Sequence, residues 1–275
     1  MTPMLELYQH GSSTCAAKVR FLLMEKGLAY RSHYVDILKG EQFRPEYLAL
    51  NPMAVVPTLV HDGAVVIEST VICEYVEDAF PQPRLRPSAA LDAARMRVWT
   101  KAVDELLQPA VKYITYAACH RHILKRLPAE KFEQYMRGPQ PGGADSRVPG
   151  DPDWSRSKRA IVEQGIDAPG VAAKFRLYDR YFAKMDEALA DAPWLAGREF
   201  SLADISLAPY VNRFDMLGMS EMWASRPRLA NWFERVQARP TFKPCFIDFC
   251  PPDLARDLRT FGAQSWPEVR RALRT

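Results

Sequence analysis

The chain has 275 residues, of which 48% are hydrophobic and 25% charged, and its formal net charge at pH 7 is +4. This is the composition of an ordinary globular protein, long enough to bury one large core or two smaller ones. Lys and Arg are interleaved with Asp and Glu, which argues against a nucleic-acid-binding face. No apolar run approaches the ~20 residues of a membrane span, and the N-terminus lacks signal-peptide features. We therefore expect a cytoplasmic protein that binds neither nucleic acid nor membrane.

The first 81 residues alternate strand-like and helix-like patterns. In chain order they read as a strand at LELY, a helix at AAKVRFLLMEKGL, a strand at YRSHYVDI, a short helix at PEYLAL, two strands in VPTLVHDGAVVIES and a helix at STVICEYVEDAF. Asp62-Gly63 between the last two strands is a strong hairpin signal. The order predicts an α/β unit, a small mixed sheet with helices on its faces.

Residues 82–91 are proline-rich and read as a linker, and strand signals nearly vanish beyond them. Within residues 92–275, Met96, Trp99, Val103 and Leu107 fall along one helical face, and further amphipathic helices follow. We predict an all-α domain here. A segment at about 128–170 contains GPQPGGADSRVPGDPD, which has no period and reads as a long loop or insertion.

Five cysteines, an odd number widely scattered, argue against a disulfide framework. There is no CxxC motif, and no histidine stands at zinc-site spacing from a pair of cysteines. His120 and His122 form an HxH, but a helix would place them on different faces. We expect no metal site.

The first predicted helix is preceded by a run of small hydroxyl and thiol side chains, Ser12, Ser13, Thr14 and Cys15. Such residues can cap the free N–H groups of a helix start, or they can take part in chemistry there. A second hydroxyl group, Ser69, stands where a strand ends and a helix begins, where it is expected to cap the free N–H groups of the helix, and the same N–H groups could bind a carboxylate. Elsewhere, Ser201-x-x-Asp204 fits a capping box, a structural feature.

Four segments in order make the chain similar to the glutathione transferases over nearly its whole length. They are NPMAVVPTLVHDG, ESTVICEYVEDAFP, FSLADISLAPY and RPRLANWFERVQARPTFK. The resemblance implies a thioredoxin-like N-terminal domain, an all-helical C-terminal domain, glutathione as co-substrate and a C2 homodimer. It also implies a cis proline at Pro57, which would leave the backbone of Val56 free to pair with glutathione. Glu68 and Ser69 would bind the γ-glutamyl ammonium and carboxylate.

The resemblance also assigns the thiolate-activating position, six residues before an aliphatic residue of the first helix. Counting back from Val19 gives Ser13, whose hydroxyl would stabilise the glutathione thiolate. Ser12 is the substitute for that role, and Thr14 supports the loop. Cys15 lies in the first helical turn, where a packing role weighs more than a redox role. Tyr8, near the end of the first strand, is a weaker alternative donor.

The second substrate is expected to be a hydrophobic electrophile bound between the domains. Tyr113, Tyr116 and His120 stand at i, i+3 and i+7, so one helix face could line an aromatic pocket, or pack in the core. ESTVICEYVEDAFP, LRP, RMRVWTKAVDE and FRLYDRYFAKMDEAL are also similar to bacterial glutathione-dependent β-aryl etherases, whereas HGSSTCAAKVR is more like serine-type transferases.

Three other functions share this fold and stay open. One is a non-catalytic glutathione-binding or interaction protein, and another is a thiol oxidoreductase based on Cys15. The third is an isomerase or dehalogenase that uses the same site. In the tail after Cys250, Phe261 and Trp266 could cover the substrate pocket, or the tail could be a packing arm or a solvated end.

Overall fold

The structure is a computed structural model that describes residues 4–137 and 152–274. The N-terminal unit is built on one four-stranded sheet with the order β2-β1-β3-β4. Its strands are β1 (Leu5–Gln9), β2 (Arg31–Tyr34), β3 (Thr58–His61) and β4 (Ala64–Ile67). β1 pairs in parallel with β2, Leu7 opposite Ser32, and antiparallel with β3, Leu7 opposite Leu59. The sheet is therefore mixed, as predicted.

The hairpin between β3 and β4 turns at Asp62 and Gly63, whose φ angles are 48° and 84°. Two successive positive φ angles define the tight turn that matches the twist of paired strands, and glycine adopts them without steric cost. The sequence prediction of a hairpin at this dipeptide is confirmed.

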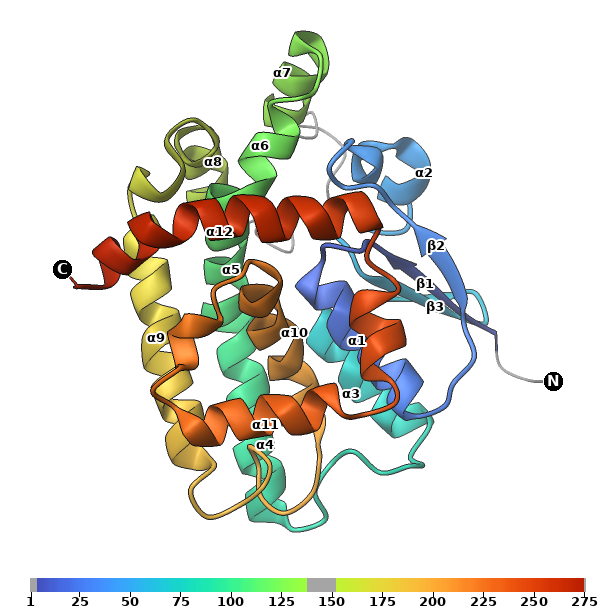
Figure 1. Cartoon of the computed structure of the whole chain (residues 1–275). Helices are drawn as coiled ribbons and strands as arrows, with labels where there is room; N and C mark the ends of the chain where they lie inside the picture. The colour runs from blue at the N-terminus through green and yellow to red at the C-terminus, as the bar shows by residue number, and fades with distance from the viewer. Residues whose placement is uncertain (1–3, 138–151, 275) are drawn as a thin grey trace.

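Helices cover both faces of the sheet (Figure 1). They are α1 (Thr14–Glu25) and α3 (Ser69–Ala79) on one face, and the short α2 (Pro45–Leu48) on the other. Along β1, Leu5 and Leu7 are buried in the same core as the apolar side chains of α1 and α3. Tyr8, one position out of phase, packs in the cluster of Val35, Tyr47 and Val56 on the opposite face.

The rest of the described chain is helical. Its α-helices are α4 (Ala90–Ala102), α5 (Gln108–Thr115), α6 (Arg121–Leu124), α7 (Ala129–Arg137), α8 (Pro152–Gln164), α9 (Val171–Ala188), α10 (Leu202–Met216), α11 (Pro227–Gln237) and α12 (Pro252–Arg274). The predicted fold class, an α/β unit followed by an all-α unit, is confirmed.

One long helical segment runs from α4 to α6, and it is not regular. Two π-helical turns, η2 (Val103–Leu107) and η3 (Tyr116–His120), interrupt it. A π turn bonds residue i to i+5 and therefore widens the helix and shifts the phase of the side chains beyond it. Met96, Val103 and Leu107 are nevertheless buried as expected, whereas Trp99 is half-buried.

Both flanks of the segment at about 128–170 are helical, so of the two interpretations, long loop or insertion, the loop is wrong for these flanks. α7 and α8 lie within it, and Tyr135 of α7 is buried with Leu124 and Val162. The two helices were not predicted because the proline and glycine residues between them are typical of a loop and led to one interpretation for the whole segment. Most of GPQPGGADSRVPGDPD lies outside the described residues.

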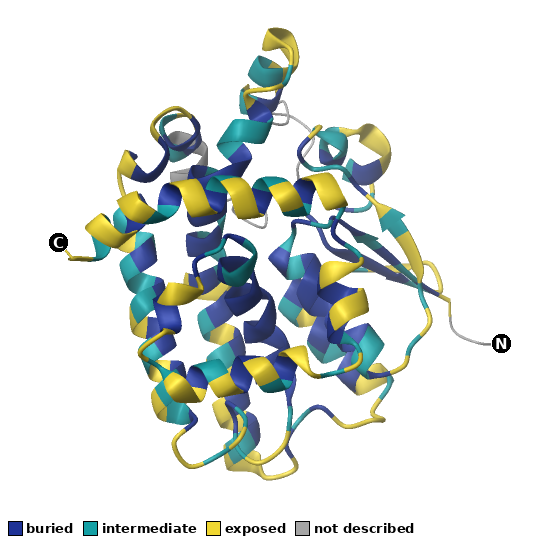
Figure 2. Ribbon diagram, in the orientation of Figure 1, coloured by how far each residue is buried: buried dark blue, intermediate teal, exposed yellow. Residues whose placement is uncertain are grey.

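The tail forms α12, which crosses the helical unit with its apolar side turned inward and its polar side exposed (Figure 2). Phe261 stacks on His122 with ring centroids 4.2 Å apart, and the Trp266 indole donates to Glu221 at 2.8 Å. Both aromatic residues pack against the core, so the packing-arm interpretation of the tail is the correct one.

The predicted capping box begins α10. Asp204 accepts hydrogen bonds from the Ser201 backbone at 3.0 Å and from the Trp232 indole at 2.8 Å. The Ser201 hydroxyl accepts from the Ala203 N–H at 3.3 Å, which completes the cap. α10 lies against α1, and it therefore brings its buried side chains to the start of that helix.

Candidate active site

The loop between β1 and α1 presents Ser13 at the N-cap of α1. Its backbone is extended, with φ −87° and ψ 116°, and its hydroxyl oxygen accepts from the Ala16 N–H at 3.1 Å. Ser13 is half-buried, and no acidic residue stands in the first turn of the helix. The partial positive charge of the helix start is therefore not neutralised by a side chain of its own first turn. This is a suitable place to stabilise an anion.

Ser12 is buried and bonded at each of its polar groups. Its N–H donates to His10 Nδ1 at 3.0 Å, and its carbonyl oxygen accepts from Arg213 Nη2 at 2.6 Å. Its hydroxyl lies 2.7 Å from His120 Nε2. We call His10, His120 and Arg213 the Ser12 anchor. Two of its three members come from the helical unit, Arg213 from α10 and His120 from η3.

Both imidazoles of the anchor are buried and neutral. Burial lowers the pKa of His10 to about 4, although the nearby Asp36 carboxylate opposes that shift. Burial and then the charge of Arg213 lower the pKa of His120 well below its ordinary value. Because His10 Nδ1 accepts from Ser12, the proton of His10 is on Nε2, which lies 3.8 Å from Asp36.

Arg213 is a fully buried guanidinium, and burial lowers its pKa. Within the described residues its Nε and Nη1 groups make no hydrogen bond, and its Nη2 donates to a carbonyl oxygen and not to a carboxylate. His120 Nδ1 is likewise buried without a partner. Buried polar groups are nearly always paired, and unpaired ones in folded proteins call for a specific explanation.

Cys15 lies in the first turn of α1, two residues after the N-cap. Its sulfur is 3.7 Å from the Tyr210 hydroxyl, which donates to Gln108 at 2.9 Å. Burial raises the pKa of the Cys15 thiol, although Lys18 and hydrogen bonds from Ser69 and Tyr210 act in the other direction. Like the other cysteines, it forms no disulfide. Such a thiol is a poor nucleophile at neutral pH.

Tyr8 lies on the other face of the sheet from α1, because alternate residues of a strand point to opposite faces. Its ring stacks on His33 with centroids 4.4 Å apart, and burial raises its pKa. It does not join the groups at the start of α1.

A second element of the candidate site is the loop that leads into β3. The Val56–Pro57 bond is cis, as the family resemblance implies. Tyr47 and Asn51 brace the loop by donating to the Val55 carbonyl oxygen at 2.6 Å and 2.9 Å. Among the described residues, nothing hydrogen-bonds to the backbone of Val56. It can therefore pair with an extended ligand.

The third element is the start of α3. Glu68 occupies the N-cap position with φ 68°, a strained conformation for a residue with a side chain, and it makes no cap hydrogen bond. Ser69 is the first helical residue and is buried. The expectation that Ser69 caps this helix is therefore wrong, since its hydroxyl lies beside Cys15 instead. The first N–H groups of α3 are left for an external acceptor.

The structure keeps two of the three residues of the predicted substrate face together. Tyr113 is buried against Ser157 of α8 and Lys174 of α9. Tyr116 and His120 contact each other, with ring centroids 4.9 Å apart, and His120 also reaches the β1–α1 loop. The π turn explains the difference, because i, i+3 and i+7 share a face only in a regular α-helix.

Tyr116 also belongs to an aromatic cluster that links the two units. Its hydroxyl bonds to that of Tyr135 on α7, and the Tyr135 ring lies 6.2 Å from that of Phe43, between β2 and α2. Phe132 and Met136 pack against the same cluster. Residues from the segment interpreted as an insertion thus stand next to the predicted substrate face.

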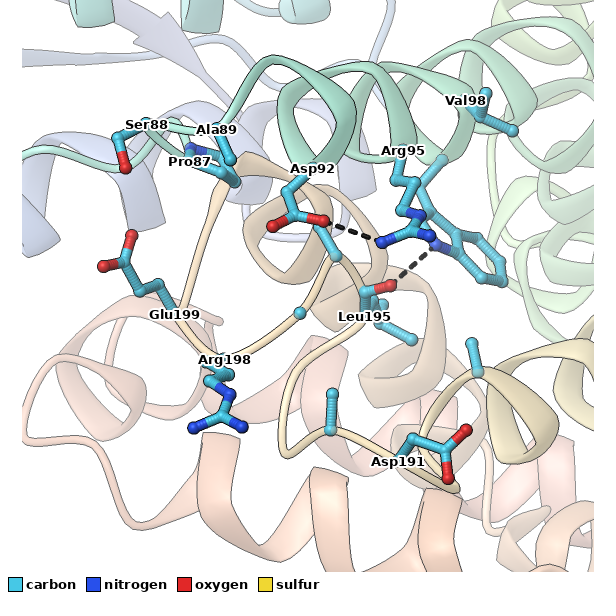
Figure 3. A pocket seen from close by; sticks show the side chains of 15 residues that line it. Pro87, Ser88, Ala89, Asp92, Arg95, Val98, Asp191, Leu195, Arg198 and Glu199 are labelled. Carbon is cyan, nitrogen blue, oxygen red and sulfur yellow. Dashed lines mark hydrogen bonds and ion pairs between the residues drawn. The ribbon is translucent and has the colours of Figure 1, made fainter.

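One cleft lies away from these three elements, beside α4 (Figure 3). Its volume is about 800 Å³, and it is lined by the linker, the start of α4 and the segment after α9. Its charged groups are already engaged or exposed: Arg95 donates to Asp92 at 2.8 Å, and Arg198 points into solvent. No residue of the three elements above lines it.

The described part of the chain contains no group of three or more His, Cys, Asp or Glu side chains arranged to bind a metal ion. Within the same residues, no helix is long and apolar enough to cross a membrane.

The sequence reasoning missed His10, Arg213 and the bracing pair of Tyr47 and Asn51. One signal was available for Arg213, a lone basic residue in the apolar run SLADISLAPYVNRF. The role of Asn51 has a local signal too, since its side chain accepts from the Met53 N–H at 3.1 Å in a turn.

Comparisons with known proteins agree with this arrangement. Residues 12–79 match the family model described as glutathione S-transferase, N-terminal domain, and residues 168–235 match its C-terminal counterpart. Protein LigF of Sphingobium sp. strain SYK-6 is 34% identical over 88% of this chain and 93% of its own. The tetrachloro-p-hydroquinone reductive dehalogenase of Sphingobium chlorophenolicum is 29% identical over 88% of this chain and 95% of its own. The crystal structure of the β-etherase LigF covers 90% of this chain and all of its own, with a TM-score of 0.77.

Proposed function

Because the chain belongs to the glutathione S-transferase family, whose co-substrate is glutathione, we propose that it activates the glutathione thiol at Ser13 and transfers it to an aromatic electrophile. The observation that carries this proposal is the position of Ser13 at the start of α1. Its oxygen accepts the Ala16 N–H at 3.1 Å, and this leaves the hydroxyl hydrogen free to donate to a thiolate. Capping and thiolate stabilisation are therefore compatible.

The energy required is modest. A free thiol has a pKa of about 8.5, and lowering it by about two units takes roughly 2.7 kcal/mol of preferential stabilisation of the anion. A hydroxyl donor together with the N–H groups and dipole of a helix start supplies interactions of that size. No general base on the protein is needed, because the thiol loses its proton to solvent.

Two further elements support glutathione binding. The unpaired backbone of Val56, beside the cis Pro57, would pair with the extended tripeptide. The uncapped start of α3 at Ser69 would bind the γ-glutamyl carboxylate, and the exposed Glu68 carboxylate would bind its ammonium group. Each element matches one group of glutathione.

For the second substrate we propose a β-aryl ether. The support is the resemblance to the β-etherase LigF and the aromatic cluster of Tyr116, Tyr135 and Phe43 that joins the two units. In the reaction the sulfur attacks the carbon that bears the aryl ether. A carbon–sulfur bond forms as the carbon–oxygen bond breaks, and the phenolate leaves with the electron pair and takes a proton from water. The step consumes no oxidant or reductant.

The test is an activity screen of wild type and Ser13→Ala with glutathione and a β-aryl ether dimer, a chlorinated hydroquinone and 1-chloro-2,4-dinitrobenzene. We expect ether cleavage, reduced about 10- to 100-fold at pH 6.5 in Ser13→Ala because the bound thiol pKa rises by roughly one to two units. Turnover of the hydroquinone alone would identify a dehalogenase. Glutathione binding without any turnover would identify a non-catalytic protein.

We also propose that the chain forms a C2 homodimer. Exposed apolar side chains follow adjacent elements of one side: Val65 on β4, Val71 on α3, and Leu91 and Val98 on α4. The ion pair of Glu74 with Arg97, at 3.9 Å, joins α3 to α4 there. Sedimentation should give a dimer for wild type and a monomer for Val71→Glu/Val98→Glu, and a wild-type monomer would contradict the proposal.

A cytoplasmic location is part of the same proposal. The five cysteines are free, as expected of a protein in the reducing compartment. Fractionation of the source cells would test it.

A further inference from the structure

Ser12 and Ser13 are neighbours with different surroundings. Ser13 is half-buried, and its hydroxyl contacts only its own helix. Ser12 is buried, and its N–H, carbonyl and hydroxyl are all bonded to the anchor at 3.0, 2.6 and 2.7 Å. Since Ser12 immediately precedes Ser13, its orientation sets the direction of the peptide that leads into the N-cap.

Two of these bonds cross from one structural unit to the other. His120 is 108 residues from Ser12 along the chain and Arg213 is 201 residues away. The start of α1 is therefore oriented by the helical unit as well as by its own sheet.

The Ser12 anchor also places polar groups in the core at a cost in folding stability that apolar side chains would not carry. Arg213 is buried with two of its N–H groups unpaired, and His120 Nδ1 is unpaired beside it. Replacing a buried charge by an apolar side chain of similar volume is often neutral or stabilising. A charge kept in such a place is therefore not explained by stability.

We infer that His120 and Arg213 are positioning residues for thiolate activation, which act through Ser12 to aim the Ser13 hydroxyl and the first N–H groups of α1 at the glutathione sulfur. This inference rests on the proposed function. Neither residue touches the sulfur in this scheme, and neither binds the carboxylates of glutathione.

The direction of the hydroxyl bond follows from the unpaired Nδ1 of His120. A buried N–H without an acceptor is rarer than a buried lone pair without a donor, so we place the proton of the neutral ring on Nε2, 2.7 Å from the Ser12 hydroxyl. His120 then donates to the Ser12 oxygen. Removing that N–H frees the Ser12 side chain and loosens the peptide before Ser13.

The test measures the pKa of the thiol of bound glutathione, from the ultraviolet absorbance of the thiolate, in His120→Phe, His120→Gln and Ser12→Ala. His120→Phe keeps the ring volume without the N–H, and we expect the thiol pKa to rise by on the order of one unit. His120→Gln retains a donor and should restore most of the wild-type value. KM for glutathione should change little, whereas kcat at pH 6.5 should fall about tenfold.

Arg213 is tested by Arg213→Met, which removes the buried charge together with the donor to the Ser12 carbonyl and is expected to raise the thiol pKa. His122→Phe is the matched control, since His122 stands two residues on and stacks on Phe261 instead. The charged or titratable groups around the Ser12 anchor are its own His10, His120 and Arg213, then Asp36, Lys39 and Arg20 near His10, and Cys119, Cys250 and Tyr178 near Arg213. The wild-type pH profile above pH 6.5 reports the thiol because both imidazoles are already neutral there.

A double-mutant cycle shows whether His120 acts through Ser12. The thiol pKa of bound glutathione in the double variant Ser12→Ala/His120→Phe should be no higher than in the more strongly affected single variant. Additive effects would overturn the inference, and so would an unchanged thiol pKa in a folded His120→Phe protein. These outcomes are distinct from failure of the proposed function, in which Ser13→Ala would leave the thiol pKa unchanged.

Discussion

At the scale of single residues, the buried histidines make stability depend on pH. Burial lowers the pKa of His10 to about 4 from 6.5, so the folded state binds fewer protons than the unfolded state between these values. The free energy of unfolding therefore rises with pH across this window. The contribution of the neutral His10 to that free energy is lost as the pH falls from 6.5 to about 4. His120 acts in the same direction.

We predict that His10 accounts for a loss of roughly 3 kcal/mol on acidification through this window. Urea unfolding of wild type and His10→Gln at several pH values should show a shallower dependence in the variant, because glutamine does not titrate. Parallel curves for the two proteins would mean that His10 is protonated in the folded state.

Cys15 gives a second prediction at this scale. Because burial raises its pKa, we expect Cys15→Ala to retain most of the glutathione-dependent activity and to lower stability by about 1 kcal/mol. The measurement is kcat/KM with an aromatic electrophile, alongside a disulfide-reduction assay. Loss of disulfide reduction in this variant, with Ser13→Ala still active in that assay, would favour a thiol oxidoreductase.

The local residue roles could be predicted from the sequence, and the distant ones could not. Asp62-Gly63 and Ser201-x-x-Asp204 act within a few residues, so their pattern suffices. The cis bond at Pro57 was implied by the family resemblance and not by a local pattern. Nothing in the sequence pairs Ser12 with His120 and Arg213, because those bonds depend on how α10 and η3 pack against α1.

At the scale of elements, the crossing of α12 over the end of α10 depends on one glycine. A Cβ atom at Gly262 would lie 2.2 Å from the Leu217 carbonyl oxygen and 2.7 Å from the Leu217 Cα. Both contacts are with backbone, which cannot move aside as a side chain can. Only glycine lets the two helices approach this closely.

We predict that Gly262→Ala destabilises the protein by roughly 2–3 kcal/mol, since the overpacked contact must separate the two helices. Gln264→Ala is the control, because it introduces the same side chain at an exposed position of the same helix. Urea unfolding measures both, and limited proteolysis should release the end of α12 faster in Gly262→Ala. Equal stability of the two variants would show that α12 can shift without cost.

Helices and strands were predictable where the apolar residues of a segment keep one spacing throughout. β1, α1 and the β3–β4 hairpin follow their predicted positions closely. The π turns η2 and η3 were not predictable from the sequence. A π turn holds one residue more than an α-helical turn, and tertiary contacts decide where in a long helix it forms. The position of His120 relative to Tyr113 depends on that extra residue.

At the scale of the whole molecule, the two units share one core. Leu7 and Phe21 of the N-terminal unit belong to the same buried cluster as Tyr210 and Phe246 of the helical unit. Arg20 of α1 donates to the Cys245 carbonyl oxygen at 2.9 Å, and its guanidinium lies 3.9 Å from the centre of the Phe249 ring. The change of periodicity near residue 82 predicts two units, but only the structure shows that their apolar faces meet.

A shared core has a thermodynamic consequence. Separating the units would expose α1, whose side chains Phe21 and Leu22 are fully buried between the sheet and the helices. Exposing each such side chain costs about 1.5–3 kcal/mol, so neither unit is stable with the other unfolded. We predict a single calorimetric transition, with calorimetric and van't Hoff enthalpies that agree for one cooperative unit. Phe21→Ala should lower the temperature of that one transition. If two transitions appear instead, and Phe21→Ala shifts only one of them, the units fold independently and the helical unit does not need α1.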